Sequence, residues 1–433
     1  MAGAVAREAD VVVVGAGIVG CAAAYHLARR GVRVVVLERG PAPGEQSRKN
    51  WGFVRQQGRD PREMPLVMEA NRIWRQLEQE LGADVEWVQG GNLALARDPE
   101  RMGLFEEWLA VARQFGLDTR LLRPRDLAAV VPGLGGEWVG GMHTPGDGHA
   151  DPAKATDALA RAATANGVSI HLQCAVQGVA TRAGAVSAVL TERGEIRTPW
   201  VVCAAGAWSS RLARTLGLVL PQRWVRGTVA RTTPAPPVTA CAVWGPGVAF
   251  RQRRDGSFNI AAGGALDHDV TLDPLRQLRF FLPSAWKNKS LFRFHVGRPL
   301  ARSLLAALPG SRARRHPLVW DRETEPSPNP VKVRGSLAEL ARVLPSMPRL
   351  DVARSWAGYI DATPDLTPVL GPVPTLGGFV FATGFSGHGF AMGPVAGRLI
   401  SELIIDGKPS LDISAFRFSR FAEGAIGKPR NVL

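Results

Sequence analysis

A glycine motif near the N-terminus constrains the fold more than any other feature of the chain. Residues 15–20 read GAGIVG and directly follow four consecutive valines at 11–14. Residues 21–30 are rich in Ala and Leu and predict a helix, and residues 32–37 predict a second buried strand that ends at Glu38. A strand, glycine turn, helix and strand within about thirty residues, closed by an acidic residue, is typical of a dinucleotide-binding βαβ unit. We therefore expect an α/β domain built on a parallel sheet.

The motif assigns a different role to each glycine. Gly15 permits the tight turn, Gly17 lets the backbone approach a pyrophosphate, and Gly20 lets the helix pack closely on the strand. The helix N-terminus then presents free N–H groups to the phosphates. Glu38 is positioned to accept hydrogen bonds from an adenosine ribose, which argues against a 2′-phosphate there.

Two later glycine-rich segments repeat this pattern of a strand followed by small residues and a helix. Residues 201–213 read VVCAAGAWSSRLA, and residues 381–404 read FATGFSGHGFAMGPVAGRLISELI. Four glycines within ten residues are unfavourable for a helix, so we interpret those of the second segment, Gly393 included, as backbone that contacts a flat ligand. The helix that follows would direct its positive end at that ligand. His388 is either a catalytic or a cofactor-binding residue in this interpretation.

Composition limits the class of protein. The chain has 433 residues, enough for two domains, and no run of about 18 apolar residues, so we expect no membrane-spanning helix. The N-terminus MAGAVAREAD lacks the pattern of a secretory signal. The four cysteines are widely spaced and form no CxxC pair, so we expect no disulfide framework, no metal site and a cytoplasmic location.

The charge is strongly positive, with 53 Lys and Arg against 38 Asp and Glu. The arginines are spread along the whole chain rather than clustered in a tail, so nucleic-acid binding is the less favoured interpretation. Attraction of acidic substrates is an alternative use of this charge.

The order of predicted elements indicates a cofactor domain made of separate segments. Helices are expected at 62–82, 99–116, 152–166 and 390–406, and strands at 169–172, 178–181, 186–190, 200–204 and 379–382. The middle of the chain, 221–350, predicts mainly strands, with helices near 273–282 and 336–344. We assign residues 1–86, 147–220 and 352–433 to the cofactor domain, and 87–146 and 221–351 to a substrate domain. The stretch 283–334, rich in Arg, Trp and Pro, receives no role.

Together these motifs resemble the D-amino-acid oxidase (DAO) superfamily of FAD enzymes. The segments that carry the resemblance are GAGIVG, Glu38-Arg39, SRKNWGFVR at 47–55, AAGAW at 204–208, WAGYIDATPDLTPVLG at 356–371 and GFSGHGF at 384–390. They are most similar to the branch that holds glycine oxidase, monomeric sarcosine oxidase and the sarcosine oxidase β-subunits. The resemblance implies an α/β fold, α+β overall: a glutathione-reductase-type FAD-binding Rossmann domain with a mixed β-sheet substrate domain.

The resemblance also implies the site residues. We predict His388, Arg55 and Tyr359 as catalytic or substrate-contacting residues, with Arg48 and Arg59 as alternatives to Arg55. FAD is expected to be non-covalent, because sarcosine-type oxidases tether it through a cysteine whose position here matches Gly358. Those enzymes also hold the substrate carboxylate with a lysine, which is replaced here by Ala391. The residues predicted to bind FAD are Gly15, Gly17, Ile18, Val19, Gly20, Glu38, Arg39, Ser47, Asn50, Trp51, Gly52, Val176, Ala205, Gly206, Trp208, Gly387, His388, Gly389 and Phe390.

The predicted reaction is oxidation of the C–N bond of an amine, secondary amine or amino or imino acid, by hydride transfer to flavin N5, which gives an imine. A secondary amine or imino acid is favoured because the TPDLTP segment resembles the sarcosine and dimethylglycine branch. A 2-hydroxy-acid dehydrogenase is the alternative, and it would need a dedicated base such as His388. A nicotinamide-dependent dehydrogenase and a basic nucleic-acid-binding protein are less favoured. A homo-oligomer and an electron-accepting subunit are both compatible partners, and oxygen, a quinone or a partner protein could accept the electrons.

Overall fold

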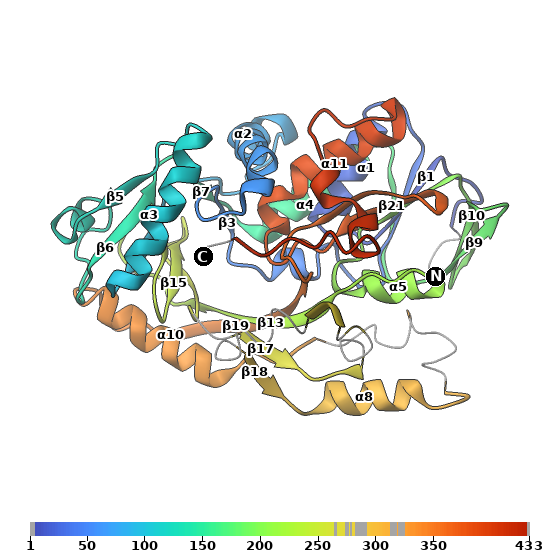
Figure 1. Ribbon diagram of the computed structural model, residues 1–433. Coiled ribbons are helices and arrows are strands. Elements are labelled where there is room, and N and C mark those ends of the chain that lie inside the picture. The colour runs from blue at the N-terminus through green and yellow to red at the C-terminus, as the bar shows by residue number, and fades with distance from the viewer. Residues whose placement is uncertain are drawn as a thin grey trace.

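The computed structural model describes residues 5–263, 266–272, 277, 279–281, 292–311, 318 and 325–430. Within these residues the strands form a nine-stranded sheet, a ten-stranded sheet and a two-stranded pair. Figure 1 shows the nine-stranded sheet with its helices on one side of the molecule and the strands of the ten-stranded sheet below and beside it.

The nine-stranded sheet has a parallel core assembled from three distant segments. Strand β1 (Val11–Val14) pairs in parallel with β2 (Val34–Leu37) on one side and β12 (Trp200–Cys203) on the other. Strand β8 (Ser169–His171) extends the sheet beyond β2, and β21 (Leu376–Thr383) extends it beyond β12, both in parallel. The expected strand–helix–strand unit at the N-terminus is therefore present and lies at the centre of this sheet.

Both faces of this core are buried. Helices α1 (Ile18–Ala28), α4 (Pro152–Ala165) and α11 (Gly389–Asp406) cover one face, where Val11 and Val13 pack. Val12 and Val14 face the other side, where helix α5 (Ser209–Thr215) contributes to the core. The four valines are thus apolar without alternation because the strand has no solvent-exposed face.

Helices α1 and α11 pack on each other through glycines of α11. A Cβ on Gly397 would lie 2.4 Å from the backbone nitrogen of Ala23, and one on Gly393 would lie 2.7 Å from Cγ2 of Ile18. The interpretation of Gly393 as backbone that contacts a ligand is therefore wrong, because this glycine permits two helices to approach.

Antiparallel strands complete the first sheet at its edges. Strands β9, β10 and β11 form a meander beside β21, and β20 pairs with the other side of β21. All five strands predicted at 169–172, 178–181, 186–190, 200–204 and 379–382 are present in this sheet with shifted ends, whereas β11 and β20 were not expected. The bounds of the edge strands are β9 (Val176–Arg182), β10 (Ala185–Thr191), β11 (Gly194–Arg197) and β20 (Val369–Val373).

The ten-stranded sheet is mixed. Strands β14 and β4 pair in parallel, as do β17 and β18, and the other pairs in this sheet are antiparallel. The strands are β4 (Asn92–Ala96), β5 (Arg120–Leu122), β6 (Gly140–Thr144), β13 (Arg223–Thr232), β14 (Ala242–Trp244), β15 (Ala249–Gln252), β16 (Phe258–Ala261), β17 (Leu266–Asp269), β18 (Phe292–His295) and β19 (Val352–Ala362).

Four further helices surround this sheet and its junction with the first. Helices α2 (Met64–Leu81) and α3 (Pro99–Gln114) are close to their predicted bounds, and α10 (Pro330–Val343) begins six residues before the helix expected at 336–344. Helix α8 (Arg298–Ala307) was not expected. The helix predicted near 273–282 lies largely outside the described residues.

The pairing of β19 bears on the proposed division into domains. This strand is hydrogen-bonded to β13 along most of its length, from Ala362 opposite Arg223 to Val352 opposite Thr232. It therefore belongs to the second sheet, although the predicted cofactor domain begins its last segment at residue 352. We propose that this segment begins at about residue 363, and the division as a whole stays a prediction.

Within the described residues, no helix is both long and apolar enough to cross a membrane. Nor does any group of three His, Cys, Asp or Glu side chains there have a geometry that could hold a metal ion. All four cysteines are buried and unpaired.

Candidate active site

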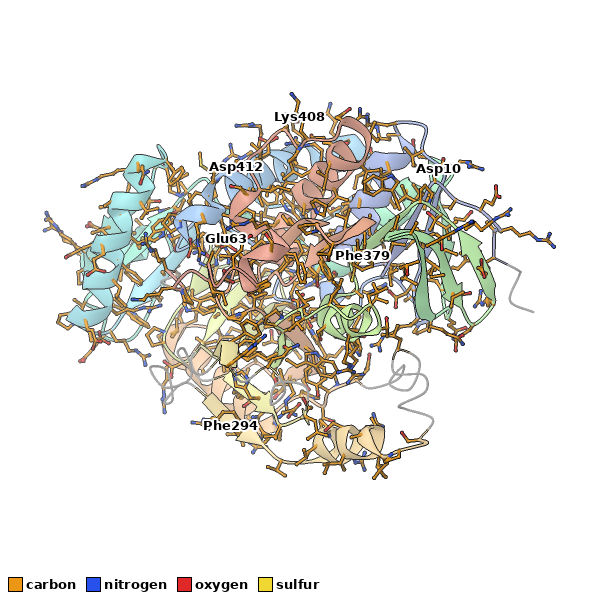
Figure 2. All side chains as sticks on the ribbon, turned by 45° about the vertical axis from the view of Figure 1, so that its right-hand side comes forward. Asp10, Glu63, Phe294, Phe379, Lys408 and Asp412 are labelled. Carbon is orange, nitrogen blue, oxygen red and sulfur yellow. The ribbon has the colours of Figure 1, made fainter. Side chains whose placement is uncertain are left out.

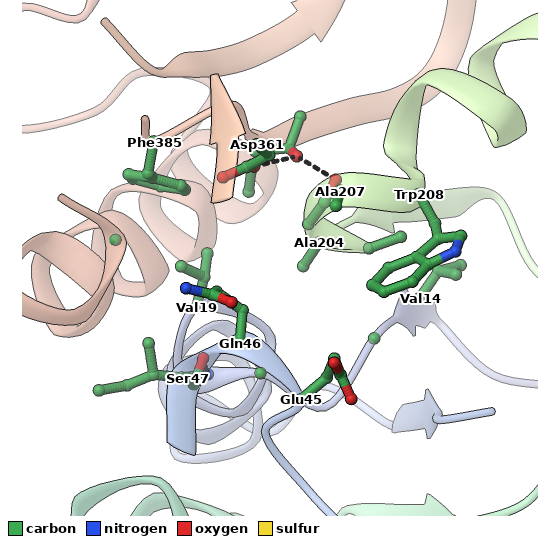
Figure 3. A pocket seen from close by; sticks show the side chains of 18 of the residues that line it. Val14, Val19, Glu45, Gln46, Ser47, Ala204, Ala207, Trp208, Asp361 and Phe385 are labelled. Carbon is green, nitrogen blue, oxygen red and sulfur yellow. Dashed lines mark hydrogen bonds between the residues drawn. The ribbon is translucent and has the colours of Figure 1, made fainter. Parts of the chain in front are cut away.

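A long cavity lies at the carboxyl ends of the parallel strands. It encloses about 1180 Å³, counting the part open to solvent, and its walls include the ends of β1, β2 and β21 and the turn after β12. Ligands of open α/β sheets bind at this edge. Figure 3 shows Gln46 and Ser47 on one wall, Phe385 and Asp361 on another, and Trp208 at one side.

The N-terminus of α1 faces this cavity through the glycine turn. Gly15 has φ +104°, and a Cβ on it would lie 2.5 Å from the carbonyl oxygen of Ala204. Gly17 precedes the helix and lines the cavity, where a Cβ would lie 3.1 Å from Ser47 Oγ. Ser47 Oγ accepts a hydrogen bond from the first helical N–H, that of Ile18, at 2.9 Å. The turn thus leaves backbone open to the cavity, as a phosphate site requires.

Glu38 and Arg39 form the next part of the wall. Glu38 accepts hydrogen bonds from the N–H groups of Ala16 at 2.9 Å and Gly40 at 2.7 Å. The Arg39 guanidinium lies 3.5 Å from the ring centroid of Trp208, which also lines the cavity. The arginine–tryptophan pair therefore lies in the same cavity as Glu38, whose binding of a ribose stays a prediction.

Asp361, at the end of β19, is a cavity residue that sequence analysis did not identify. Its Oδ2 accepts hydrogen bonds from the Gly384 N–H at 2.7 Å and from Thr383 Oγ1 at 3.3 Å (Figure 3). Burial raises its pKa to about 6, although these hydrogen bonds act in the opposite direction. No strand was predicted at 352–362, so the signal that identified Glu38, an acid at the end of a buried strand, was not applied to Asp361.

The residues of the cavity fit FAD bound without a covalent link. Besides the glycine turn, the buried Oε1 of Gln46 has no hydrogen-bond partner and belongs to a cavity-lining side chain. A Cβ on Gly358 would lie 2.2 Å from this same Oε1. The position that matches the tethering cysteine therefore has no room for one unless Gln46 moves.

Most of the predicted FAD-binding residues meet at this cavity, although they come from six separate segments of the chain. Those that line it are Gly15, Gly17, Ile18, Val19, Glu38, Arg39, Ser47, Asn50, Val176, Ala205, Gly206, Trp208, Gly387, Gly389 and Phe390. Gly20, Trp51, Gly52 and His388 do not line it. A Cβ on Gly20 would lie 2.0 Å from the carbonyl oxygen of Gly15, so this glycine serves helix–strand packing, as its motif position predicts.

Tyr359 points away from the cavity. Its hydroxyl donates a hydrogen bond to Asp269 at 2.8 Å, and its ring packs on Trp224. The next residue, Ile360, lines the cavity. Tyr359 itself is not among the residues that line the cavity, whereas both residues that follow it are. The catalytic role of Tyr359 stays a prediction.

His388 forms a buried pair with Glu63. Its Nδ1 lies 3.1 Å from Glu63 Oε1, and the other carboxylate oxygen of Glu63 is buried without a partner. Burial lowers the pKa of His388, and the charge of Arg59 adds to this effect. His388 thus lies directly behind the cavity-lining turn, with this ring nitrogen directed at an acid.

Arg55 is buried beside Trp244. Its Nη1 donates a hydrogen bond to the carbonyl oxygen of Gln57 at 2.6 Å, and its guanidinium lies 5.5 Å from the Trp244 ring centroid. Trp244 in turn packs on Trp51 at 4.8 Å. Trp51 follows Asn50, which lines the FAD cavity, so this cationic and aromatic cluster adjoins the cofactor site.

A second arginine lies against the first. Arg59 Nε donates a weak hydrogen bond to the carbonyl oxygen of Arg55 at 3.4 Å, and its buried Nη1 has no partner. In the described part of the chain, neither guanidinium forms an ion pair with a carboxylate. Burial lowers the pKa of both arginines, and for Arg55 the nearby charge of Arg59 lowers it further. Arg48, the other candidate, pairs with Asp157 through two hydrogen bonds and is not available.

Comparison with known proteins agrees with this site. The chain matches the DAO family, described as FAD dependent oxidoreductase, over residues 10–403. It is 27% identical over 421 residues to mitochondrial sarcosine dehydrogenase from Mus musculus, which covers 95% of the chain and 41% of the relative. The chain thus spans less than half the length of this curated relative.

Solved structures show the same fold. L-Amino acid deaminase from Proteus myxofaciens, in complex with anthranilate, aligns with a TM-score of 0.89 and 27% identity, covering 97% of this chain and 95% of that one. L-Proline dehydrogenase from P. horikoshii aligns with a TM-score of 0.80 and 25% identity, covering 97% and 99%.

The chain therefore belongs to the DAO family of FAD-dependent oxidoreductases, as the sequence motifs predict. Its relatives act on amino acids and amines.

Proposed function

We propose that this enzyme oxidises the C–N bond of an amino acid or secondary amine that carries a carboxylate. The observation that carries the proposal is the pair of buried arginines, Arg55 and Arg59, beside the cofactor cavity. Among the described residues neither forms an ion pair within 4 Å, and the charges of Glu63 and Asp147 act on both from farther away. A buried charge is costly unless it is paired, so an acidic substrate group would complete this cluster.

Bound FAD would supply the hydride acceptor, and the chain supplies orientation and electrostatics. Arg55 would hold the carboxylate, and Trp51 and Trp244 would pack against the remainder of the substrate. The amine must be neutral to be oxidised, and a desolvated site next to two cations favours the neutral form of an amine. A dedicated base is therefore not required.

The names of the relatives support this substrate class. Sarcosine, proline and the L-amino acids all have a carboxylate on the carbon next to the amine nitrogen. A 2-hydroxy acid has the same carboxylate but needs a base for its hydroxyl proton. The His388–Glu63 pair is the one observation that favours that alternative, since an acid-oriented neutral imidazole can act as a base. The amine is preferred because the names of the relatives are those of amino-acid and amine enzymes.

Substitution of Arg55 tests the anchor. Replacing it with Met should lower kcat/KM for a carboxylate-bearing amine by about 10- to 150-fold, the equivalent of one charge-assisted hydrogen-bonded pair. The matching ester or decarboxylated amine should lose far less. Arg113→Met, at an exposed position of α3, is the matched control. Equal losses for acid and ester, or no loss for either, would remove Arg55 from the substrate site.

A substrate screen with an artificial dye as acceptor decides between amines and 2-hydroxy acids. Repeating the screen with oxygen alone identifies the class of electron acceptor, and size-exclusion chromatography with light scattering measures the oligomeric state. We propose a cytoplasmic location, which the four buried, unpaired cysteines support.

A further inference from the structure

The segment that contains β18 and α8 carries an unusual charge. Residues 274–320 contain ten basic residues and no Asp or Glu, whereas the whole chain has 38 acidic residues. The basic residues are Arg276, Arg279, Lys287, Lys289, Arg293, Arg298, Arg302, Arg312, Arg314 and Arg315. This segment therefore concentrates positive charge that ion pairs within it cannot neutralise.

The same segment exposes large apolar side chains. Phe294 and Val296 are 70% and 77% exposed, and Leu304, Leu305 and Leu308 are 50%, 52% and 54% exposed. Phe294 lies near the edge of the molecule in Figure 2. Scattered exposed leucines are ordinary, but five large apolar side chains within fifteen residues are a concentration that marks an interaction surface.

Helix α8 directs its apolar side outward. Ala301, Leu304, Leu305 and Leu308 are spaced i, i+3, i+4 and i+7, so they share one side, and all four are exposed. None of the residues of α8 is buried. A surface helix normally turns its leucines toward the core, whereas α8 leaves two of its three leucines, Leu304 and Leu305, exposed and only Leu300 half-buried.

Basic residues flank this outward side. Arg298 precedes Ala301 and Leu305 by three and seven positions, which places it on the same side of the helix, and it is exposed. Arg293 is exposed on β18, the edge strand of its sheet. Leucines flanked by arginines, with no acid in the segment, form the pattern of a helix that lies in the interface of an anionic membrane.

We propose that β18 and α8 dock this enzyme on the surface of an anionic lipid bilayer, without spanning it. The exposed leucines would enter the boundary between head groups and acyl chains, and the arginines would contact lipid phosphates. Figure 1 shows α8 at the outer margin of the molecule, away from α1 and α11. A projecting helix can enter a bilayer surface, whereas a nucleic acid would engage the charges and leave the leucines in water.

Vesicle sedimentation of the full-length, FAD-loaded protein tests this proposal. Binding should be strong to phosphatidylcholine vesicles with about 30% phosphatidylglycerol and weak to phosphatidylcholine alone. It should fall as NaCl is raised from about 0.05 to about 0.5 M. Replacing Leu304, Leu305 and Leu308 with Ser should weaken binding at least about tenfold, because the apolar contact is lost while the charge is kept.

Matched variants separate the two contributions. Arg293→Gln with Arg298→Gln should weaken binding to anionic vesicles by about fivefold per residue at low salt and leave any binding to neutral vesicles unchanged. Val139→Ser with Val219→Ser removes two exposed apolar side chains elsewhere on the surface and should have no effect. Flavin absorbance and circular dichroism should be unchanged in all variants, which shows that they are folded without reliance on the proposed substrate.

Three results would overturn the proposal. The first is an absence of binding to either kind of vesicle at low salt. The second is binding that the triple Ser variant does not weaken, which would leave only a general charge effect such as attraction to a nucleic acid. The third is a dimer that the triple Ser variant converts to a monomer, which would assign this surface to a second copy of the chain.

Discussion

The buried carboxyl of Asp361 should make the stability of the flavin-free protein depend on pH. Its pKa in the folded chain is raised from 3.8 to about 6 by burial. A group with a raised pKa binds its proton more tightly in the folded state, so its favourable contribution is present below about pH 4. This contribution is lost as the pH rises through about 6. Two pKa units correspond to about 3 kcal/mol.

The substitution Asp361→Asn removes the titration and keeps the shape of the side chain. The amide oxygen that it introduces can still accept the 2.7 Å hydrogen bond from the Gly384 N–H. The variant should therefore gain stability relative to the wild type as the pH rises from about 4 to 7, by up to about 3 kcal/mol. Asp147, whose pKa is also raised to about 6, is present in both proteins and cancels in the difference.

Urea unfolding of the flavin-free protein across this pH range measures the effect, because the pKa applies to the ligand-free cavity. Asp126→Asn, at an exposed carboxylate, controls for the loss of one negative charge. A stability difference between variant and wild type that stays constant with pH would refute the argument. So would a difference that moves in favour of the wild type at high pH.

Further outcomes follow from the cavity. Acid precipitation should release the yellow colour into the supernatant, because Gly358 offers no thiol, and colour retained in the pellet would contradict a non-covalent flavin. Gly17→Val should purify colourless, since its side chain would occupy the phosphate turn, while Gly103→Val, where a Cβ meets nothing within 4 Å, should keep full flavin absorbance. Glu63→Gln should shift the NMR titration of His388 to lower pH, because the substitution removes a negative charge that stabilises the imidazolium. An unchanged titration would mean that the pair is not formed in solution.

The glycine turn and the acid that line the cavity could be predicted from sequence because they belong to one short segment of the chain. The turn requires φ +104° at Gly15, and the helix requires close packing at Gly20. The two glycines must therefore occur at a fixed spacing within one short segment. Glu38 follows from the same unit, since the end of β2 must lie beside the end of β1 in a parallel pair. Each of these inferences required only the βαβ unit and the chemistry of a dinucleotide.

The substrate side was harder to predict because it depends on long-range pairing. Strand β19 pairs with β13 across more than 100 residues of chain, and this pairing places Ile360 and Asp361 at the cavity while Tyr359 packs on Trp224. Nothing in the segment itself fixes the register of this pairing. Asp361 was missed for the same reason, since it enters the cavity only when β19 meets the turn at Gly384.

The arginines behind Trp51 show how burial changes the meaning of a sequence feature. In sequence, Arg55 is one of many arginines and a surface position is its ordinary explanation. In the structure it is 6% exposed and Arg59 is 3% exposed, with Arg59 donating to the Arg55 carbonyl oxygen. The charge of Arg59 lowers the pKa of Arg55, so two like charges that interact out of water disfavour the folded state. An anionic group bound beside them would offset this cost, which is why their burial, and not their place in the sequence, carries the proposed carboxylate anchor.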